Sequence, residues 1–344
     1  MIYINLLLIV LVIITVHEFG HYLAARLFNA EVTEFSIGFG KTLYQYLDKN
    51  NTNWKISILP LGGYVKIKGL DSIFQKNQIK NNESGTFQSL SLIKQIIILL
   101  AGSFFNILSV VICLSTFIFF VGYKSYTNEV GDINKDSSAE INDIRKGDKI
   151  ISINNIIIKD FNDLIKNIGN EENIIIKIDR NNILLDKNIK LNYDNNLNKY
   201  LLGISNSNNF INYKYNFTKS ISNSIFFIPN FYKQFFYSLN KSFKNETLTK
   251  ELAGPIGIVK NADKLMLNKF SGIINMFILF SLSIGMLNLL PIPLLDGGHI
   301  VYFIVRDIFS NSLPHIITRI YIATGITIIS FMFFMITFND IFYK

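Results

Sequence analysis

The sequence has 344 residues, of which 49% are hydrophobic and 17% are charged, and its formal net charge is +8. A mean hydropathy of +0.31 argues against a soluble globular protein, which needs enough polar residues to cover its surface. The single cysteine, Cys113, excludes an internal disulfide and a cysteine-rich metal site. Nucleic-acid binding is not expected, because no basic patch with interleaved aromatic residues stands out.

Four stretches are almost free of charge and long enough to cross a membrane as helices. They cover residues 1–28, about 92–121, about 273–295 and 316–338. The first is expected to be a retained span, because its apolar run exceeds that of a signal peptide and no basic residue precedes Arg26. We therefore predict a polytopic α-helical membrane protein that resides in the lipid bilayer.

The segment between the first two spans has the pattern of β-strands. Trp54–Leu61 alternates apolar and polar residues, and Gly62–Lys68 follows a turn that contains proline and glycine. Two short strands around such a turn predict a hairpin. Gly38–Gly40, just upstream, predicts a break in the chain.

A small unit of short strands is predicted between the second and third spans, over residues 149–154, 156–158, 173–178 and 183–191. Ser138–Asn155, followed by Phe161–Leu164, resembles the core of a PDZ domain. Ser220–Leu239, rich in phenylalanine, is predicted to be a helix on the membrane surface or a helix packed on the soluble unit. The expected divisions are a first membrane half, a PDZ-like domain, an amphipathic connector and a second membrane half, at residues 1–122, 123–210, 211–270 and 271–344.

The first span contains His17-Glu18-Phe19-Gly20-His21. Residues four apart lie on one face of a helix, so both imidazoles can bind one metal ion. Glu18 is then placed to take a proton from water at that ion, and zinc suits such a site. A polar seam between helices is the structural alternative, but a carboxylate inside an apolar span costs on the order of 3 kcal/mol without a partner.

A third metal ligand is needed, and the candidates are His299, His315 and Asp296. Two prolines and two glycines between 291 and 298 must interrupt a helix here. Irregular backbone at membrane depth is tolerated where it lines a cavity, and an acidic residue there indicates a functional site. Asp296 is the predicted ligand, and the two histidines are predicted to be ordinary interfacial residues.

These motifs resemble the site-2 protease family, and most closely its bacterial regulator of sigma-E protease type. The resemblance rests on His-Glu-x-x-His in the first span, on the run Asn-Leu-Leu-Pro-Ile-Pro-Leu-Leu-Asp-Gly at 288–297 and on the PDZ-like insert between them. It covers nearly the whole chain. It implies that Zn²⁺ is the cofactor, with His17, His21 and Asp296 as ligands and Glu18 as the catalytic acid/base.

The resemblance also implies parts that bind substrate. Asn288 matches an asparagine that holds the substrate backbone, and the predicted hairpin resembles a membrane-re-entrant sheet whose edge strand, with Gly62, Gly63 and Tyr64, contacts substrate. Ala101–Asn106 resembles an Ala-Gly-Pro-x-x-Asn motif in which Ser103 replaces the helix-breaking proline. Ala253–Gly257 resembles a Gly-Pro segment that precedes the third span.

The implied function is hydrolysis of peptide bonds in or near the transmembrane segment of single-span membrane proteins, such as anti-sigma factors or remnant signal peptides. Basic residues concentrate in the loops that join spans one and two and spans three and four, which places those loops in the cytoplasm. The expected location is therefore the bacterial inner membrane, with the PDZ-like domain on the periplasmic side and the metal nearer the cytoplasm.

Three other functions make different predictions. A catalytically idle membrane adaptor that uses the PDZ-like domain would show an eroded metal motif, whereas every position is intact. A metal transporter would show internal repeats, and the sequence has none that we detect. A soluble zinc protease with an anchor would carry His-Glu-x-x-His in a polar domain instead of in a span.

Overall fold

The computed structural model describes residues 2–70, 84–168, 171–194, 199–244, 269–309 and 314–342. They fall into two compact units: Met1–Thr116 with Ser220–Lys344, called the membrane unit below, and Phe117–Lys219, called the inserted unit. The predicted Gly-Pro segment Ala253–Gly257 lies outside the described residues.

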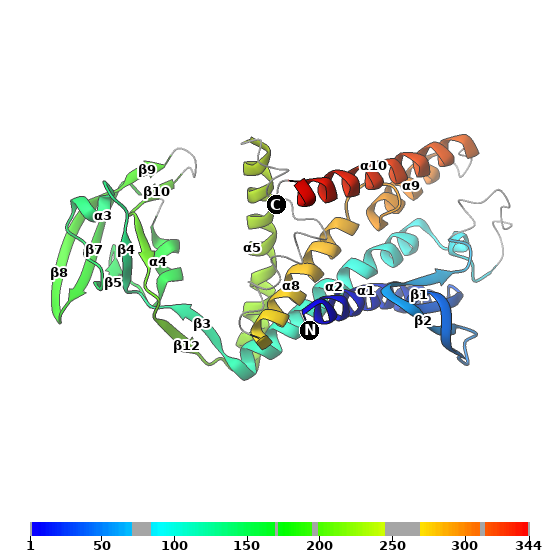
Figure 1. Ribbon diagram of the computed structural model, residues 1–344, viewed down its shortest axis with the longest axis horizontal. Helices are drawn as coiled ribbons and strands as arrows, with labels where there is room; N and C mark the ends of the chain where they lie inside the picture. Colours follow the sequence, from blue (N-terminus) through cyan, green and yellow to red (C-terminus); the bar gives the residue numbers. More distant parts are fainter. Residues whose placement is uncertain are drawn as a thin grey trace. The chain divides into compact units, whose positions relative to one another are not determined.

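Four helices of the described residues are long and apolar enough to cross a membrane. They are α1 (Ile2–Leu27), α2 (Leu92–Val121), α8 (Lys269–Asn288) and α10 (His315–Phe342) (Figure 1). The chain is thus a polytopic helical membrane protein, as predicted. The third span is shorter than expected: α8 ends at Asn288 instead of continuing to 295.

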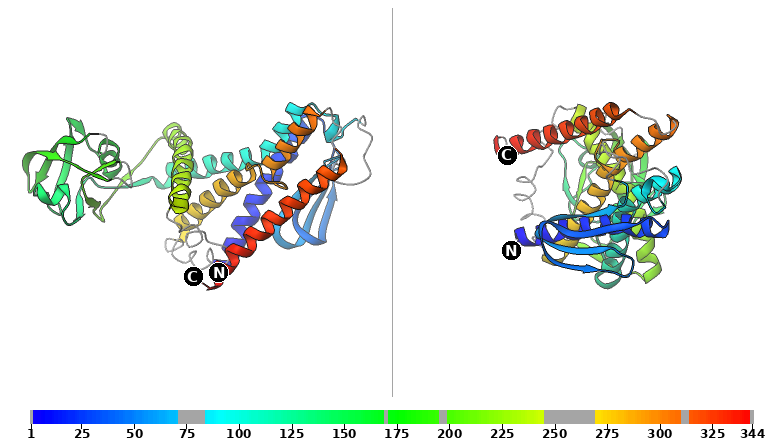
Figure 2. Two further views of the ribbon diagram at one scale, coloured as in Figure 1. Left: turned by 90° about the horizontal axis from the view of Figure 1, so that it is seen from above. Right: turned by 90° about the vertical axis from the view of Figure 1, so that its right-hand side faces the viewer.

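Helix α8 packs against both α1 and α2 through apolar side chains. The ribbon shows α8 running beside α1 and α2 (Figures 1 and 2). Met276 is buried against Ile9 and Ile13 of α1, while Ile278 and Leu282 are buried against α2. Helices α1 and α2 also approach each other closely. A Cβ atom at Gly20 would lie 2.5 Å from the carbonyl oxygen of Ala101, so only glycine fits there.

Strands β1 (Val32–Leu47) and β2 (Asn53–Ile67) form a two-stranded sheet beside α1 (Figure 1). The predicted pairing within 54–68 is wrong, because β2 is continuous and both its halves pair with β1: Phe35 lies opposite both Trp54 and Val65. The predicted break at Gly38–Gly40 appears as an irregularity in the register of β1, with positive φ at both glycines. Local alternation could not distinguish these pairings, since it fixes only which face each side chain takes.

A short helix that the sequence did not predict, α9 (Asp296–Ile308), follows the irregular residues 289–295. Pro291 and Pro293 have no N–H to continue α8. Leu294 adopts a left-handed backbone, with φ of 77°. The glycines do not break a helix, contrary to the prediction; they lie in the first turn of α9, where a Cβ at Gly297 would collide with the carbonyl of Leu289.

The inserted unit consists mainly of short strands, with a four-stranded sheet in the order β6-β5-β7-β8. Its helices α3 (Ser138–Ile141) and α4 (Phe161–Asn167) begin at Ser137 and Asp160, whose side chains accept a backbone N–H. The strands are β3 (Tyr123–Tyr126), β4 (Val130–Ile133), β5 (Lys149–Ile153), β6 (Ile156–Ile157), β7 (Asn173–Arg180), β8 (Ile183–Lys190), β9 (Asn192–Asp194), β10 (Lys199–Leu201), β11 (Ile204–Asn206) and β12 (Phe210–Tyr213). The four predicted strands are confirmed to within two residues at each end.

The predicted phenylalanine-rich helix is α5 (Phe217–Lys244). Phe231 and Tyr232 pack against the cluster that joins α2 and α8. Phe226 and Phe236 are exposed. One face of α5 therefore belongs to the membrane unit, and another carries exposed aromatic side chains.

Candidate metal centre and active site

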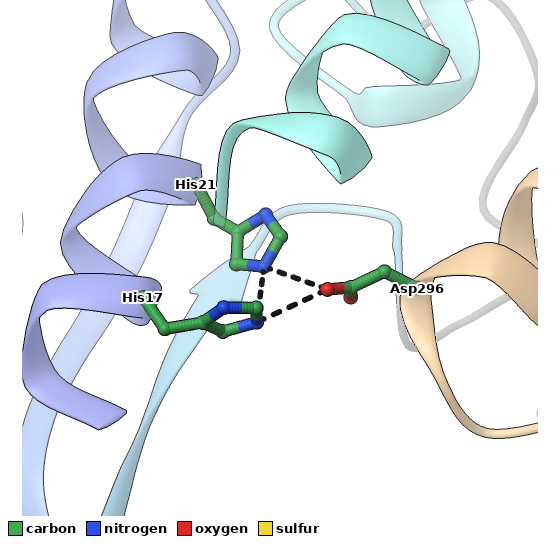
Figure 3. A group of neighbouring side chains, drawn as sticks. All are labelled: His17, His21 and Asp296. Carbon is green, nitrogen blue, oxygen red and sulfur yellow. Dashed lines mark hydrogen bonds and ion pairs between the residues drawn. The ribbon is translucent and has the colours of Figure 1, made fainter. Parts of the chain in front are cut away.

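The two histidines of α1 point their ring nitrogens at one point. His17 and His21 are one helical turn apart, and they are only 5% and 6% exposed. Their Nε2 atoms lie 3.2 Å apart (Figure 3). Two neutral imidazoles that face each other through unprotonated nitrogens gain nothing from this contact, but they can share a cation.

Asp296 brings the third donor atom to the same point from the first turn of α9. Its Oδ2 lies 3.0 Å from His17 Nε2 and 3.4 Å from His21 Nε2 (Figure 3). Zinc bonds of about 2.0–2.1 Å in a tetrahedron require donor atoms about 3.3 Å apart. The three separations therefore fit the edges of a zinc tetrahedron, and the fourth corner carries no protein ligand from the described residues.

The hydrogen bonds around the cluster also fit a metal. Because a backbone carbonyl can only accept, His21 Nδ1 donates to the carbonyl oxygen of Ile98 at 2.7 Å. This bond places the proton on Nδ1 and leaves Nε2 free as a ligand. Apart from its contacts with the two histidine nitrogens, Asp296 Oδ2 is buried and has no hydrogen-bond donor within the described part of the chain. A buried carboxylate oxygen without a donor needs a cation.

The Glu18 carboxylate links α1 to the sheet. Its Oε2 accepts the backbone N–H of Val65 in β2 at 3.0 Å. The carboxylate is half-buried and shares a helical turn with both histidines. It is thus held between the metal ligands and a strand edge, where an acid/base group would serve an extended peptide.

The four predicted substrate-binding residues lie around this site. Gly62 and Gly63 are buried in β2, just before Val65, and the hydroxyl of Tyr64 donates to Glu34 at 2.9 Å. Asn288, the last residue of α8, places its Nδ2 3.1 Å from His17 Nε2. Their contacts with a substrate stay a prediction.

The other two histidines of the sequence do not join the cluster. Among the residues that the structure describes, the group with metal-ligand geometry consists of His17, His21 and Asp296. His299 lies in α9 outside this group, and the side chain of His315 is not among the described parts.

Gly102 of α2 leaves room for the two histidine rings, a role that the sequence alone did not predict. A Cβ atom there would lie 2.6 Å from Cε1 and 2.7 Å from Nε2 of His17, and closer still to His21 Nε2. The helix runs unbroken past Ser103, so the absent proline leaves α2 continuous. A glycine inside an apolar span was the available signal, since it often marks close helix packing.

We expect Gly102→Ala to weaken zinc binding by about 5- to 150-fold, because overpacking a filled site costs about 1–3 kcal/mol. Chelator competition on the purified protein measures this loss. Gly285→Ala is the matched control: its Cβ would meet Asn106 Cβ at an ordinary 3.4 Å. Equal zinc affinity for the two variants would show that the histidines do not depend on this clearance.

Comparison with known proteins decides the family. The model of peptidase family M50 matches residues 5–332. The chain belongs to this family. This M50 chain is accordingly a membrane zinc metalloprotease, and zinc is its cofactor. The complete donor cluster favours this conclusion over the idle adaptor.

Relatives from several bacteria align with this M50 chain along almost its full length. A Rickettsia conorii protein named "Putative zinc metalloprotease" is 33% identical, over 98% of both chains. A Campylobacter jejuni protein with the same description is 32% identical, over 97% of this chain and 91% of its own. A third, from Helicobacter pylori strain J99, is 30% identical over 96% of each.

Proposed function

We propose that this chain is an intramembrane zinc endopeptidase that cuts single-span membrane proteins in or near their transmembrane segment. The observation that carries the proposal is the buried convergence of His17, His21 and Asp296 between apolar helices. The histidines belong to the candidate span α1, and Gly102 of the candidate span α2 packs directly on them. A site enclosed in this way is suited to a substrate that arrives through the bilayer.

In this proposal the two histidines and Asp296 hold the metal, and Glu18 moves the protons. Bound zinc supplies a Lewis acid, which polarises a carbonyl and lowers the pKa of water. Glu18 takes a proton from the attacking water and delivers it to the leaving amine, as a positioned carboxylate can. The hydrogen bond from the N–H of Val65 holds the Glu18 carboxylate in position for both proton transfers.

Strand addition to β2 is the proposed mode of substrate binding. A transmembrane helix hides its peptide bonds in its own hydrogen bonds, so a short segment must unwind before cleavage. The Val65 end of β2 pairs with β1 on one side and faces Glu18 on the other. The backbone N–H and C=O groups of successive residues in a strand point to opposite edges. Those of Gly63, two residues before Val65, therefore face the same outer edge and can bind an extended segment.

The remaining groups of the site support the same arrangement. With His17 Nε2 serving as a metal ligand, the Asn288 amide, which lies 3.1 Å from it, would be free to donate to a substrate carbonyl. The sheet is braced by Glu34, whose pKa is lowered by the hydrogen bond from Lys55, and which also accepts from Tyr64. The Tyr64 side chain is thus engaged, and it is proposed to hold the strand instead of the substrate.

The exposed apolar residues indicate where the bilayer would lie. The far part of the β1–β2 sheet exposes large apolar side chains, which suit a sheet that enters the membrane: Leu43, Tyr44, Ile58, Leu59 and Leu61. We propose that the inserted unit is a PDZ-like domain on the periplasmic side of a bacterial inner membrane, as the distribution of basic residues predicts. Anti-sigma factors and remnant signal peptides are the proposed substrates.

A pair of single-span reporters tests this mode of cleavage. The reporters differ only at the centre of the span, where one carries Gly-Pro and its control Leu-Leu. Because proline costs a helix interior about 3 kcal/mol, we expect cleavage of the Gly-Pro reporter to be up to roughly 100-fold faster in proteoliposomes. Cleavage confined to the soluble parts of both reporters, at equal rates, would contradict intramembrane proteolysis.

A further inference from the structure

Asn106 of α2 contacts the zinc-ligand candidate His17 from the side opposite the metal position. Its side chain is fully buried, and its Nδ2 lies 3.4 Å from His17 Nδ1. Its Oδ1 is also buried and has no hydrogen-bond partner within the described chain. Buried polar atoms in proteins nearly always form hydrogen bonds, so the unpaired Oδ1 of this amide needs an explanation.

The tautomer of His17 supplies that reason. If Nε2 binds zinc, the ring proton must lie on Nδ1, so Nδ1 is a donor and needs an acceptor. Nδ2 of Asn106 is itself a donor and cannot serve. The oxygen and nitrogen of an amide have nearly the same shape, so rotating the group by 180° brings Oδ1 to Nδ1 at no steric cost.

We propose that Asn106 is a positioning residue whose Oδ1 accepts the Nδ1 proton of His17 and aims Nε2 at zinc. His21 already has the equivalent bond, to the carbonyl of Ile98. The two ligands of α1 are thus oriented by two acceptors of α2, one from the backbone and one from a side chain. The inference rests on the zinc-ligand assignment proposed above.

The backbone of Asn106 is itself fixed, so its side chain has a firm base. Its carbonyl oxygen accepts from Ser109 Oγ at 2.7 Å and from Ser281 Oγ of α8 at 3.1 Å. The bond from Ser281 ties α8 to α2 beside the site. Asn106 therefore orients His17 from a position that two helices share.

The zinc affinity of Asn106 variants in the purified full-length protein tests the proposal by chelator competition. Asn106→Leu keeps the size but removes the acceptor, and we expect about 10- to 100-fold weaker binding, as for other outer-shell partners of metal ligands. Asn106→Asp keeps an acceptor and is expected to stay near the wild-type affinity. Ser115→Ala, which removes a buried hydroxyl of α2 that bonds the carbonyl of Ile112 and does not contact Asn106, is the matched control and should bind zinc normally.

The results distinguish a wrong role for Asn106 from a wrong assignment of His17 as a zinc ligand. Unchanged affinity in Asn106→Leu, or an equal loss in Asn106→Asp and Asn106→Leu, would overturn the inference, because an acceptor role requires that only the acceptor matter. If Asn106→Leu fails to fold, Asn106→Ala tests the same loss with a smaller side chain. His17→Ala is measured in parallel: if it keeps full zinc affinity, the ligand assignment fails first.

Discussion

Replacing Glu18 by glutamine is expected to abolish proteolysis while zinc stays bound. The amide has the shape of the carboxylate, and its oxygen can still accept the N–H of Val65, so the local structure is kept. An amide cannot take up and return a proton at neutral pH. Since general acid–base catalysis contributes about 10²–10⁴-fold, we expect the cleavage rate of a reporter to fall at least 100-fold. Reporter cleavage and zinc content are measured on the same preparations.

The matched control is Glu31→Gln, which removes an exposed carboxylate that pairs with Lys68. Exposed ion pairs contribute only about 0–1 kcal/mol, so this variant should cleave at the wild-type rate. If Glu18→Gln cleaves the reporter as fast as Glu31→Gln, Glu18 is not the catalytic acid/base. Loss of zinc in Glu18→Gln would instead assign it to the metal site.

Replacing Asp296 by alanine is expected to remove zinc and, with it, all cleavage. The residue supplies one of three donor atoms, at 3.0 Å and 3.4 Å from the two histidine nitrogens. Losing a ligand should exceed the roughly 10- to 100-fold effect of disturbing an outer-shell partner. We therefore expect a loss of more than 100-fold in zinc affinity, measured by chelator competition.

Asp307→Asn provides the comparison for this variant, because Asp307 is an exposed carboxylate on the same helix α9. It should bind zinc as the wild type does. Added zinc at high concentration should restore part of the activity of Asp296→Asn, whose amide oxygen remains a weak ligand. Wild-type zinc affinity in Asp296→Ala would exclude this residue from the donor set.

The metal-ligand residues of the site could be predicted from short stretches of the sequence. The apolar run around His17 and His21 predicts a helix, and residues four apart in a helix lie on the same face. The sequence alone therefore places both rings together. The prolines at 291 and 293 likewise predicted an interrupted helix, although α8 ends at Asn288, before the expected end of the span at 295. Asp296 was predicted as the third ligand because a carboxylate at membrane depth, beside an interrupted helix, indicates a functional site. The structure brings it to both histidines.

Contacts between distant segments could not be predicted in this way. The pairing of β1 with both halves of β2 depends on which strands meet in space, and alternation is equally satisfied by a hairpin within 54–68. The bond from Val65 to Glu18 joins a strand edge to a helix 47 residues earlier. The clearance at Gly102 exists only because α1 lies against α2 there, and the sequence shows only a small residue.

The start of α9 was missed for a related reason. Gly297 and Gly298 suggest a broken helix when local propensity alone is considered. In the structure both are helical, and the absence of a side chain lets α9 pack closely on the irregular segment before them, which a Cβ at either position would strike. Tertiary packing therefore overrides the propensity and sets the first residue of the helix at the proposed ligand Asp296.

The most direct measurement is the mass of the fragments that purified wild-type protein releases from a single-span reporter in proteoliposomes. It is made with zinc present, after removal of zinc by a chelator, and after zinc is added back. We predict two fragments whose masses place the cut in or next to the spanning segment, their loss on chelation and their return with zinc. A cut confined to a soluble region remote from the bilayer, or cleavage that persists without zinc, would contradict it.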